Sequence, residues 1–311
     1  MYHPYFRGKQ FELITIRETA KLLAQSNFIP IIEPVREALG GLQRTLKTVF
    51  DVNGKAVVIV NPGHGDHHED GTGISALLKK YYLGNDSIVA GILLKNDMGL
   101  GEALECYEQH KTHTPTFVHA GFTEAKALAE ALGDKLPETR NVFFEAYCGK
   151  LYRKHFAEST RILLRDGFKR QRNADYQLLD KFSDLHVTFA DEGMNGFGDF
   201  LIVGDDYNEG GGPAYAVAIH LTFIDTDQDD EMYIYHFVSK TNDTPTDPAG
   251  KFAEALEKLI KKLDSGASKL IETTAIQEFR QLYAKGHFPG LGYVKKLSMM
   301  HHIETLASYF S

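Results

Sequence analysis

The sequence has few cysteines, no excess of basic residues and no long apolar run. Its 311 residues contain two cysteines, Cys106 and Cys148. They supply neither a disulfide framework nor the paired spacing of a metal site, so we expect a reduced, intracellular chain. The formal net charge of −8 argues against a general nucleic-acid-binding surface, and we do not expect extended nucleic acid as a partner.

No stretch approaches the roughly 18 uninterrupted apolar residues that a membrane-spanning helix needs. The first residues, MYHPYFRGKQFE, lack the apolar central segment of a secretory signal. We therefore expect a cytoplasmic protein without a membrane partner. Hydrophobic residues make up 43% and charged residues 24% of the chain, which is typical of a globular protein with a sizeable core.

Short apolar runs that stop at a polar residue recur through the first 190 residues. The clearest are residues 28–33, 56–61, 88–95, 114–119, 141–145 and 161–166. Such runs indicate strands buried on both faces, and helix-like stretches between them indicate parallel pairing. We predict an α/β fold, a TIM-like (β/α)8 barrel with irregular elements, over an open doubly wound sheet. The eighth strand is expected at residues 184–190, with residues 215–223 as the alternative.

The remainder of the chain departs from this rhythm. Residues 193–243 are expected to form a glycine-rich insertion followed by a β-hairpin with an acidic turn. Residues 245–311 are expected to form a helical part packed on the barrel, within a single domain that spans residues 1–311. A short helix is expected at residues 175–182.

Four histidines occur in this later part. His220 and His236 are expected to be packed or hydrogen-bonded residues of the hairpin. Of the adjacent His301 and His302 in the last helix, one is expected to face the core and the other to face outward.

Polar residues at the strand ends are the main candidates for function, because α/β barrels bind ligands beyond the carboxyl ends of their strands. Carboxylates can act as acids or bases, and a buried lysine and a fixed cation can orient a reacting group. Strand ends also border solvent, where polar residues are ordinary. The candidate catalytic residues are Glu33, Lys95, Glu145, Arg165 and Asp166, and the candidate ligand-binding residues are Asn61 and His119.

A basic cluster follows the run that ends at residue 166. Lys169, Arg170 and Arg172 lie within four positions, just after Gly167. The loop after the seventh strand of a barrel often binds phosphate, and arginine forks suit phosphate oxygens. We include these three residues as candidate phosphate ligands, with a solvated basic loop as an equal alternative.

The loop at residues 64–70, HGDHHED, concentrates histidines and carboxylates. Such donors suit transition metals, but the run lies in a glycine-flanked loop without helical ligand spacing. We therefore expect an exposed loop and assign no metal ligand and no cofactor. A metal-dependent hydrolase or nuclease that uses Asp66, His67 and Asp70 with Glu33 stays as an alternative.

The opening residues YHPYFRGKQFELITIRE and the following IPIIEPV resemble the start of the bacterial and phage "beta protein" family. Residues 172–176, 214–223 and 287–302 extend a looser similarity to most of the chain. The resemblance implies a barrel-like fold and a mobile-element or phage-defence context. It transfers no catalytic residue.

These observations favour a barrel protein that binds or acts on an anionic, phosphate-bearing small molecule or nucleotide, and whether it is an enzyme is left open. The alternative from a different class is a non-catalytic interaction or scaffold subunit of a defence or phage complex. In that case the partner is a protein, and the hairpin with its acidic turn is the docking surface.

Overall fold

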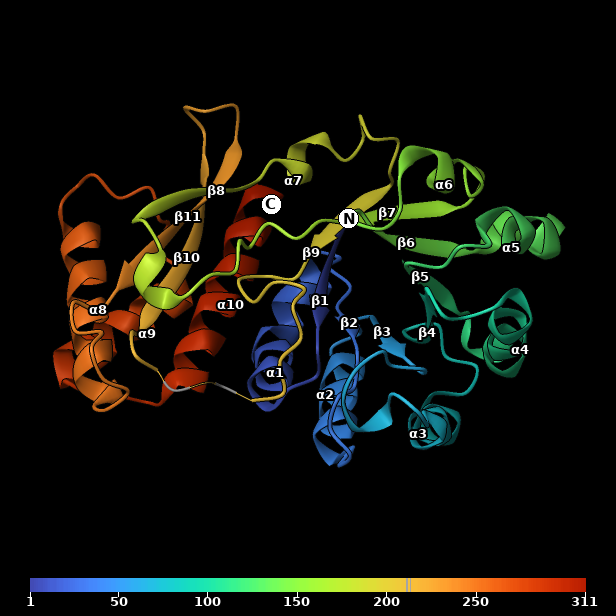
Figure 1. The fold of residues 1–311 in the computed structure, drawn as a ribbon, viewed down its shortest axis with the longest axis horizontal. Helices are drawn as coiled ribbons and strands as arrows, with labels where there is room; N and C mark the ends of the chain where they lie inside the picture. The colour runs from blue at the N-terminus through green and yellow to red at the C-terminus, as the bar shows by residue number, and fades with distance from the viewer. Residues whose placement is uncertain (211, 213) are drawn as a thin grey trace. The chain divides into compact units, whose positions relative to one another are not determined.

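The computed structural model describes residues 1–210, 212 and 214–311. Eight parallel strands close into a barrel in the order β1-β2-β3-β4-β5-β6-β7-β9 (Figure 1). The predicted (β/α)8-like barrel is confirmed. Its strands are β1 (Tyr2–Phe6), β2 (Ile31–Ile32), β3 (Ala56–Ile59), β4 (Ile88–Lys95), β5 (Thr116–Ala120), β6 (Arg140–Phe144), β7 (Thr160–Leu164) and β9 (Gly196–Asp199).

Helices follow most of the barrel strands. They are α1 (Gln10–Gln25), α2 (Gly40–Asp51), α3 (Thr72–Tyr82), α4 (Leu100–His110), α5 (Ala125–Leu132), α6 (Lys150–Lys154) and α7 (Leu185–Thr188). Alternate strand residues fill the barrel with apolar side chains, among them Tyr5, Ile31, Leu93, Phe144 and Phe200. Successive side chains of a strand point to opposite faces, so a strand-end residue two positions after an interior residue points into the barrel mouth.

The eighth barrel strand does not lie where the sequence predicts it. Residues 184–190 contain helix α7, and the alternative at residues 215–223 belongs to another sheet. The barrel is closed by β9, which pairs with β1 and β7. A Cβ atom at Gly196 would lie 2.5 Å from the main-chain oxygen of Met1, and one at Gly198 would collide with that of His3. The strand therefore needs glycine at these two positions so that its main chain can approach the N-terminal segment closely. Because glycine has no apolar side chain, the strand does not appear as an apolar run in the sequence.

A second, antiparallel sheet has the order β10-β11-β8. Its strands are β10 (Ala218–Asp225), β11 (Glu231–Val238) and β8 (Leu179–Ser183). The predicted hairpin is confirmed as β10 and β11. The short helix predicted at residues 175–182 is wrong: only a 3-10 turn at Asn173–Asp175 is helical, and pairing with β11 makes the rest a strand. Tertiary pairing decides such short, ambiguous segments.

Three helices accompany this sheet, as Figure 1 shows in orange and red. They are α8 (Pro248–Asp264), α9 (Thr274–Lys285) and α10 (Leu291–Tyr309), and the prediction of helices in this part is confirmed. His301 and His302 are both fully buried, so the expectation that one faces outward is wrong. His301 is bonded to Thr273 and His302 to Thr222, which supplies the partners that buried imidazoles need.

The chain divides into two compact units. The first comprises Met1–Asp166 and Leu185–Phe200, and the second comprises Gly167–Asp184 and Leu201–Ser311. These bounds differ from the sequence-based divisions at residues 193 and 245. In the described part of the chain no helix has the length and apolarity to cross a membrane.

Candidate functional site

Glu33 lies at the mouth of the barrel in the first unit and is fully buried. Its Oε2 accepts a hydrogen bond from the Tyr5 hydroxyl at 2.8 Å and pairs with the Arg7 guanidinium. Its Oε1 accepts a hydrogen bond from the Gly63 main-chain N–H at 2.8 Å. The carboxylate is thus compensated by a cation and two neutral donors, as a buried charge requires. Glu33 is therefore built into the fold at the strand ends.

Lys95 and Asn61 also lie at the ends of barrel strands, but of these two side chains only that of Asn61 is held by hydrogen bonds to described residues. The Asn61 side chain bonds both the N–H and the carbonyl of Leu93, at 2.8 and 2.9 Å, so it holds strands together. A Cβ atom at Gly63 would lie 3.6 Å from Glu33 Oε1 and 3.8 Å from Lys95 Cδ, so the lysine stem and the carboxylate both lie next to Gly63. Lys95 Nζ has no hydrogen-bond or ion-pair partner within the described part of the chain.

Glu145 and Arg165 form a second ion pair at the strand ends. Arg165 Nε and one terminal nitrogen donate to the two carboxylate oxygens of Glu145 at 2.5 and 2.8 Å. Their side chains are 27% and 32% exposed for Arg165 and Glu145, so solvent or a ligand can reach the pair. Asp166, the next residue, is exposed. Because both carboxylate oxygens of Glu145 are held by Arg165, the pair is better suited to binding a polar group of a ligand than to proton transfer.

The structure does not bring His119 to the mouth. Val118 belongs to the barrel interior, so His119 points to the opposite side of β5. It is fully buried there against the rings of Phe143 and Phe156. Tyr152 and Asn141 bond its two ring nitrogens at 2.7 and 3.0 Å. His119 is thus a satisfied core histidine, and burial lowers its pKa to about 3.

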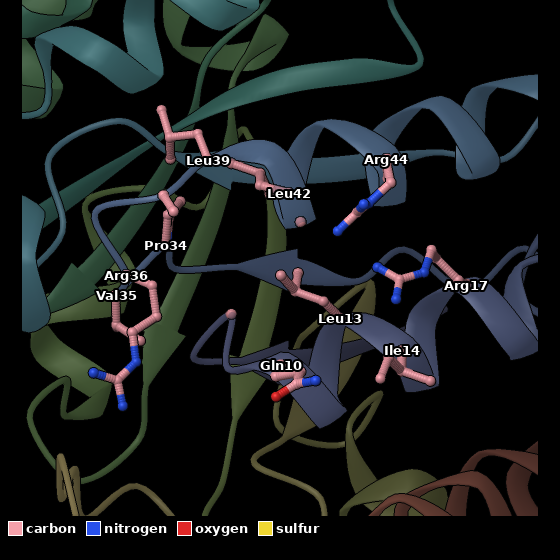
Figure 2. Close-up of a pocket in the computed structure, with 13 residues that line it drawn as sticks. Gln10, Leu13, Ile14, Arg17, Pro34, Val35, Arg36, Leu39, Leu42 and Arg44 are labelled. Carbon is pink, nitrogen blue, oxygen red and sulfur yellow. The ribbon is translucent and has the colours of Figure 1, made fainter.

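A cavity of about 200 Å³ lies between the starts of α1 and α2, next to the segment that follows β2 (Figure 2). Leu13, Leu39 and Leu42 give it apolar walls. Figure 2 shows the guanidinium groups of Arg17 and Arg44 turned toward one another across it. Burial and the repulsion from Arg44 lower the pKa of Arg17.

Neither of these two arginines has an ion pair to a carboxylate within residues 1–210, 212 and 214–311. Arg17 donates one hydrogen bond, to the Thr45 hydroxyl at 3.0 Å. The cavity therefore carries a local positive charge in an acidic protein. A concave site with apolar walls and a few converging polar groups is the usual form of a small-molecule site.

The basic cluster lies in the second unit, whereas the barrel strands belong to the first. Arg172 is exposed and pairs with Asp175 through two hydrogen bonds, at 2.7 and 3.3 Å. Arg170 donates to the main-chain oxygen of Asp206 at 2.9 Å. Lys169 is exposed. Arg172 is thus the least available of the three for a phosphate group.

The side chains of the loop at residues 64–70 bind the loop itself and its neighbours. Asp66 accepts a hydrogen bond from the Glu37 N–H, and Asp70 accepts one from the Thr72 N–H. His67 is bonded to the Arg36 carbonyl at 3.1 Å. Considering only the positions that the structure describes, no three His, Cys, Asp or Glu side chains are gathered so as to hold a metal.

The sequence reasoning did not select Arg7, Arg17 or Arg44. A signal exists for Arg7, because it directly follows the short, mostly apolar segment of residues 2–6, as the other candidates follow their apolar runs. Arg17 and Arg44 are 27 positions apart on two different helices, and only the packing of α1 against α2 brings them together.

The fold and these sites define the class of the protein as a (β/α)8-type barrel with a second unit of sheet and helices. No protein-family model matches the chain, and no curated protein matches it. The resemblance to the beta protein family accordingly stays a prediction.

Proposed function

We propose that this protein binds a small anionic, phosphate-bearing molecule or nucleotide, and that the cavity between Arg17 and Arg44 holds the anionic group. The observation that carries this proposal is the pair of guanidinium groups facing each other, neither of which forms an ion pair with a carboxylate in the described part of the chain. Two facing cations repel: burial is the main cause of the lowered pKa of Arg17, repulsion from Arg44 lowers it further, and Glu18 acts in the opposite direction. An anion between them would replace that repulsion with attraction on both sides.

The chemistry of the cavity fits a phosphate group with an apolar body attached. Guanidinium groups present planar forks that match phosphate oxygens with two hydrogen bonds each. Leu39 and Leu42 offer apolar contact to the remainder of the ligand, such as a base. A volume of about 200 Å³ admits a small molecule and falls short of a large cofactor.

Reaction chemistry, if the ligand is transformed, would belong to the barrel mouth. Gly8 and Pro34 line the cavity, and they directly follow Arg7 and Glu33, which form the buried ion pair of the mouth. Lys95 is the strand-end cation that has no partner among the described residues and can therefore contact a ligand. We propose Lys95 as the group that orients the ligand there.

Titration of the full chain with adenosine 5′-monophosphate, adenosine and inorganic phosphate tests this proposal. The monophosphate should bind more tightly than adenosine. Arg17→Met and Arg44→Met should each weaken its binding by about tenfold, the value of one charge-assisted hydrogen-bonding group. The matched controls are Lys21→Met and Lys47→Met, which lie four and three residues further along the same two helices.

The controls should leave the affinity unchanged. Equal binding by all four variants, or equal binding of adenosine and its monophosphate, would reject the cavity as an anion site. Unfolding temperatures of the variants show whether a loss of binding is a loss of folding.

A second candidate function is that of an interaction subunit in a phage-defence or mobile-element complex, the context that the resemblance implies. It is favoured by the two ion pairs Arg7–Glu33 and Arg165–Glu145, which neutralise most of the strand-end charge. The mass of the native protein in gently lysed cells tests it. A species with the mass of one chain, 34.9 kDa, would reject this function, whereas a larger complex of defined composition is expected if it holds.

A further inference from the structure

Two histidines of the second unit lie opposite each other in the hairpin. His220 of β10 and His236 of β11 are direct cross-strand partners. Their Nδ1 atoms are 2.6 Å apart, which is a hydrogen-bond distance. Two imidazoles can bond through Nδ1 only when one carries the hydrogen and the other offers its lone pair. The direction of this bond decides what each ring presents at its other nitrogen.

Asp180 of β8 fixes that direction. Its Oδ2 lies 3.4 Å from Nε2 of His236, which is the far side of that ring. A carboxylate accepts, so His236 carries its hydrogen on Nε2 and offers a lone pair at Nδ1. His220 must then donate from Nδ1, which leaves its own Nε2 without a hydrogen. The chain of contacts Asp180–His236–His220 thus ends in an imidazole nitrogen with a free lone pair.

The surroundings keep the rings in place and leave one end open. His236 is buried and stacks on Tyr176 with ring centres 4.4 Å apart. Phe168 packs edge-on against His220 at 5.1 Å. His220 is only half-buried, and its Nε2 has no hydrogen-bond partner in the described part of the chain. This open end of the relay is where a ligand would make contact.

Cations from two other segments surround the relay. Burial, His236 and Lys295 of α10 all lower the pKa of His220. Burial raises the pKa of Tyr176, the ring that covers His236, and the positive charge of Arg170 from the basic cluster opposes this rise. Burial also lowers the pKa of His236 to about 4. Both imidazoles are therefore neutral near pH 7, so the charges beside the relay are those of Lys295 and Arg170, which attract an anionic ligand, and that of Asp180 at its far end.

We propose that Asp180, His236 and His220 form a proton relay whose open nitrogen, His220 Nε2, accepts a proton from a hydroxyl group or water at an anionic, phosphate-bearing ligand. The proton passes from the oxygen to Nε2, and the electron pair of the broken O–H bond stays on that oxygen. Lys295 and Arg170 attract the anionic group of the ligand. The sites differ in unit and in residues, so this inference does not depend on the cavity between Arg17 and Arg44.

The protonated nitrogens can be identified directly by long-range ¹H–¹⁵N correlation spectra of the histidine side chains in the full chain. His236 should carry hydrogen on Nε2 and His220 on Nδ1, each with a preference of about tenfold or more over the other tautomer. Asp180→Asn removes the carboxylate and should return a substantial fraction of hydrogen to Nε2 of His220. Asp243→Asn, an exposed aspartate in the same unit, is the matched control and should change neither ring.

Chemical modification gives a second readout. Diethyl pyrocarbonate acylates unprotonated imidazole nitrogens, so His220 should react faster than His236, and Asp180→Asn should slow its reaction. Inorganic phosphate should protect His220 and shift its Nε2 resonance. Lys295→Met and Arg170→Met should weaken this protection by about tenfold each. Lys285→Met, an exposed lysine of α9, should not change it.

Two results would overturn the relay: hydrogen on Nε2 of His220 in the unmodified protein, or an Asp180→Asn protein with unchanged tautomers and reactivity. A relay with the expected tautomers but without any effect of phosphate on His220 would overturn the anionic ligand. Loss of nucleotide binding in Arg44→Met with an intact His220 response would separate the two sites.

Discussion

Replacing Arg7 by methionine tests the energetics of the barrel mouth most directly. The Glu33 side chain is 0% exposed and that of Arg7 is 8% exposed. The substitution leaves a buried carboxylate whose remaining donors among the described residues are the Tyr5 hydroxyl and the Gly63 N–H. Breaking a buried pair by removing one partner costs about 3–5 kcal/mol. Because two donors remain, we expect the lower end, a loss of about 3 kcal/mol in the free energy of unfolding.

Urea unfolding followed by far-ultraviolet circular dichroism measures this loss. The control is Lys47→Met, which breaks an ion pair whose side chains are 70% and 52% exposed. Exposed pairs contribute about 0–1 kcal/mol, so this variant should unfold almost like the unmodified protein. The double variant Arg7→Met, Glu33→Gln should be less destabilised than the sum of the two single variants, since no unpaired charge is left.

A loss for Arg7→Met below about 1 kcal/mol, similar to that of Lys47→Met, would refute this reasoning. It would mean that Glu33 is neutral or reached by water in the folded protein. The mouth would then present a carboxylate that is free to act on a ligand.

Three further outcomes are expected. Gly198→Ala should destabilise the protein markedly, because its Cβ atom would collide with a main-chain oxygen of β1. The control Gly101→Ala, whose Cβ atom would meet nothing within 4 Å, should not destabilise it. Thermal unfolding of the two variants measures the difference. Cys148 should react slowly with iodoacetamide at pH 7.5, because burial raises its pKa to about 12 and leaves little thiolate, and mass spectrometry follows the reaction. Burial lowers the pKa of His119 to about 3 in the folded state. The stability that the protein gains from the neutral imidazole is therefore complete above the unfolded pKa of about 6.5, and it declines as the pH falls from there toward 3. By pH 5 it should cost about 2 kcal/mol, and His119→Gln should flatten the dependence of stability on pH.

The barrel could largely be predicted because its strands are buried on both faces. Runs such as residues 56–61 and 88–95 then contain only apolar residues before their polar ends. The exception is β9, whose Gly196 and Gly198 are selected by close main-chain approach and carry no apolar side chain. Sequence patterns report burial of side chains, so a strand defined by backbone contact leaves no comparable signal.

The candidate site could be predicted only as a location. Glu33, Lys95, Glu145 and Arg165 do lie at the ends of barrel strands, as their positions in the sequence indicate. Whether each is free or paired depends on neighbours far along the chain, such as Arg7 for Glu33. The alternation of side chains separates His119 from the mouth, and a shift of one residue in the strand would have reversed that assignment.

The order in which the chain visits the two units has a consequence for biosynthesis. The chain enters the second unit at Gly167, returns to the first at Leu185, and leaves it again after Phe200. On the ribosome β8 is therefore made before β9 can complete the barrel, yet β11, the only strand with which β8 pairs in the described chain, is made later. A fragment that ends near residue 200 would carry an orphaned strand. Neither unit can be produced by a single cut of the gene, and because the segments of the two units alternate along the chain, no circular permutation makes either unit continuous.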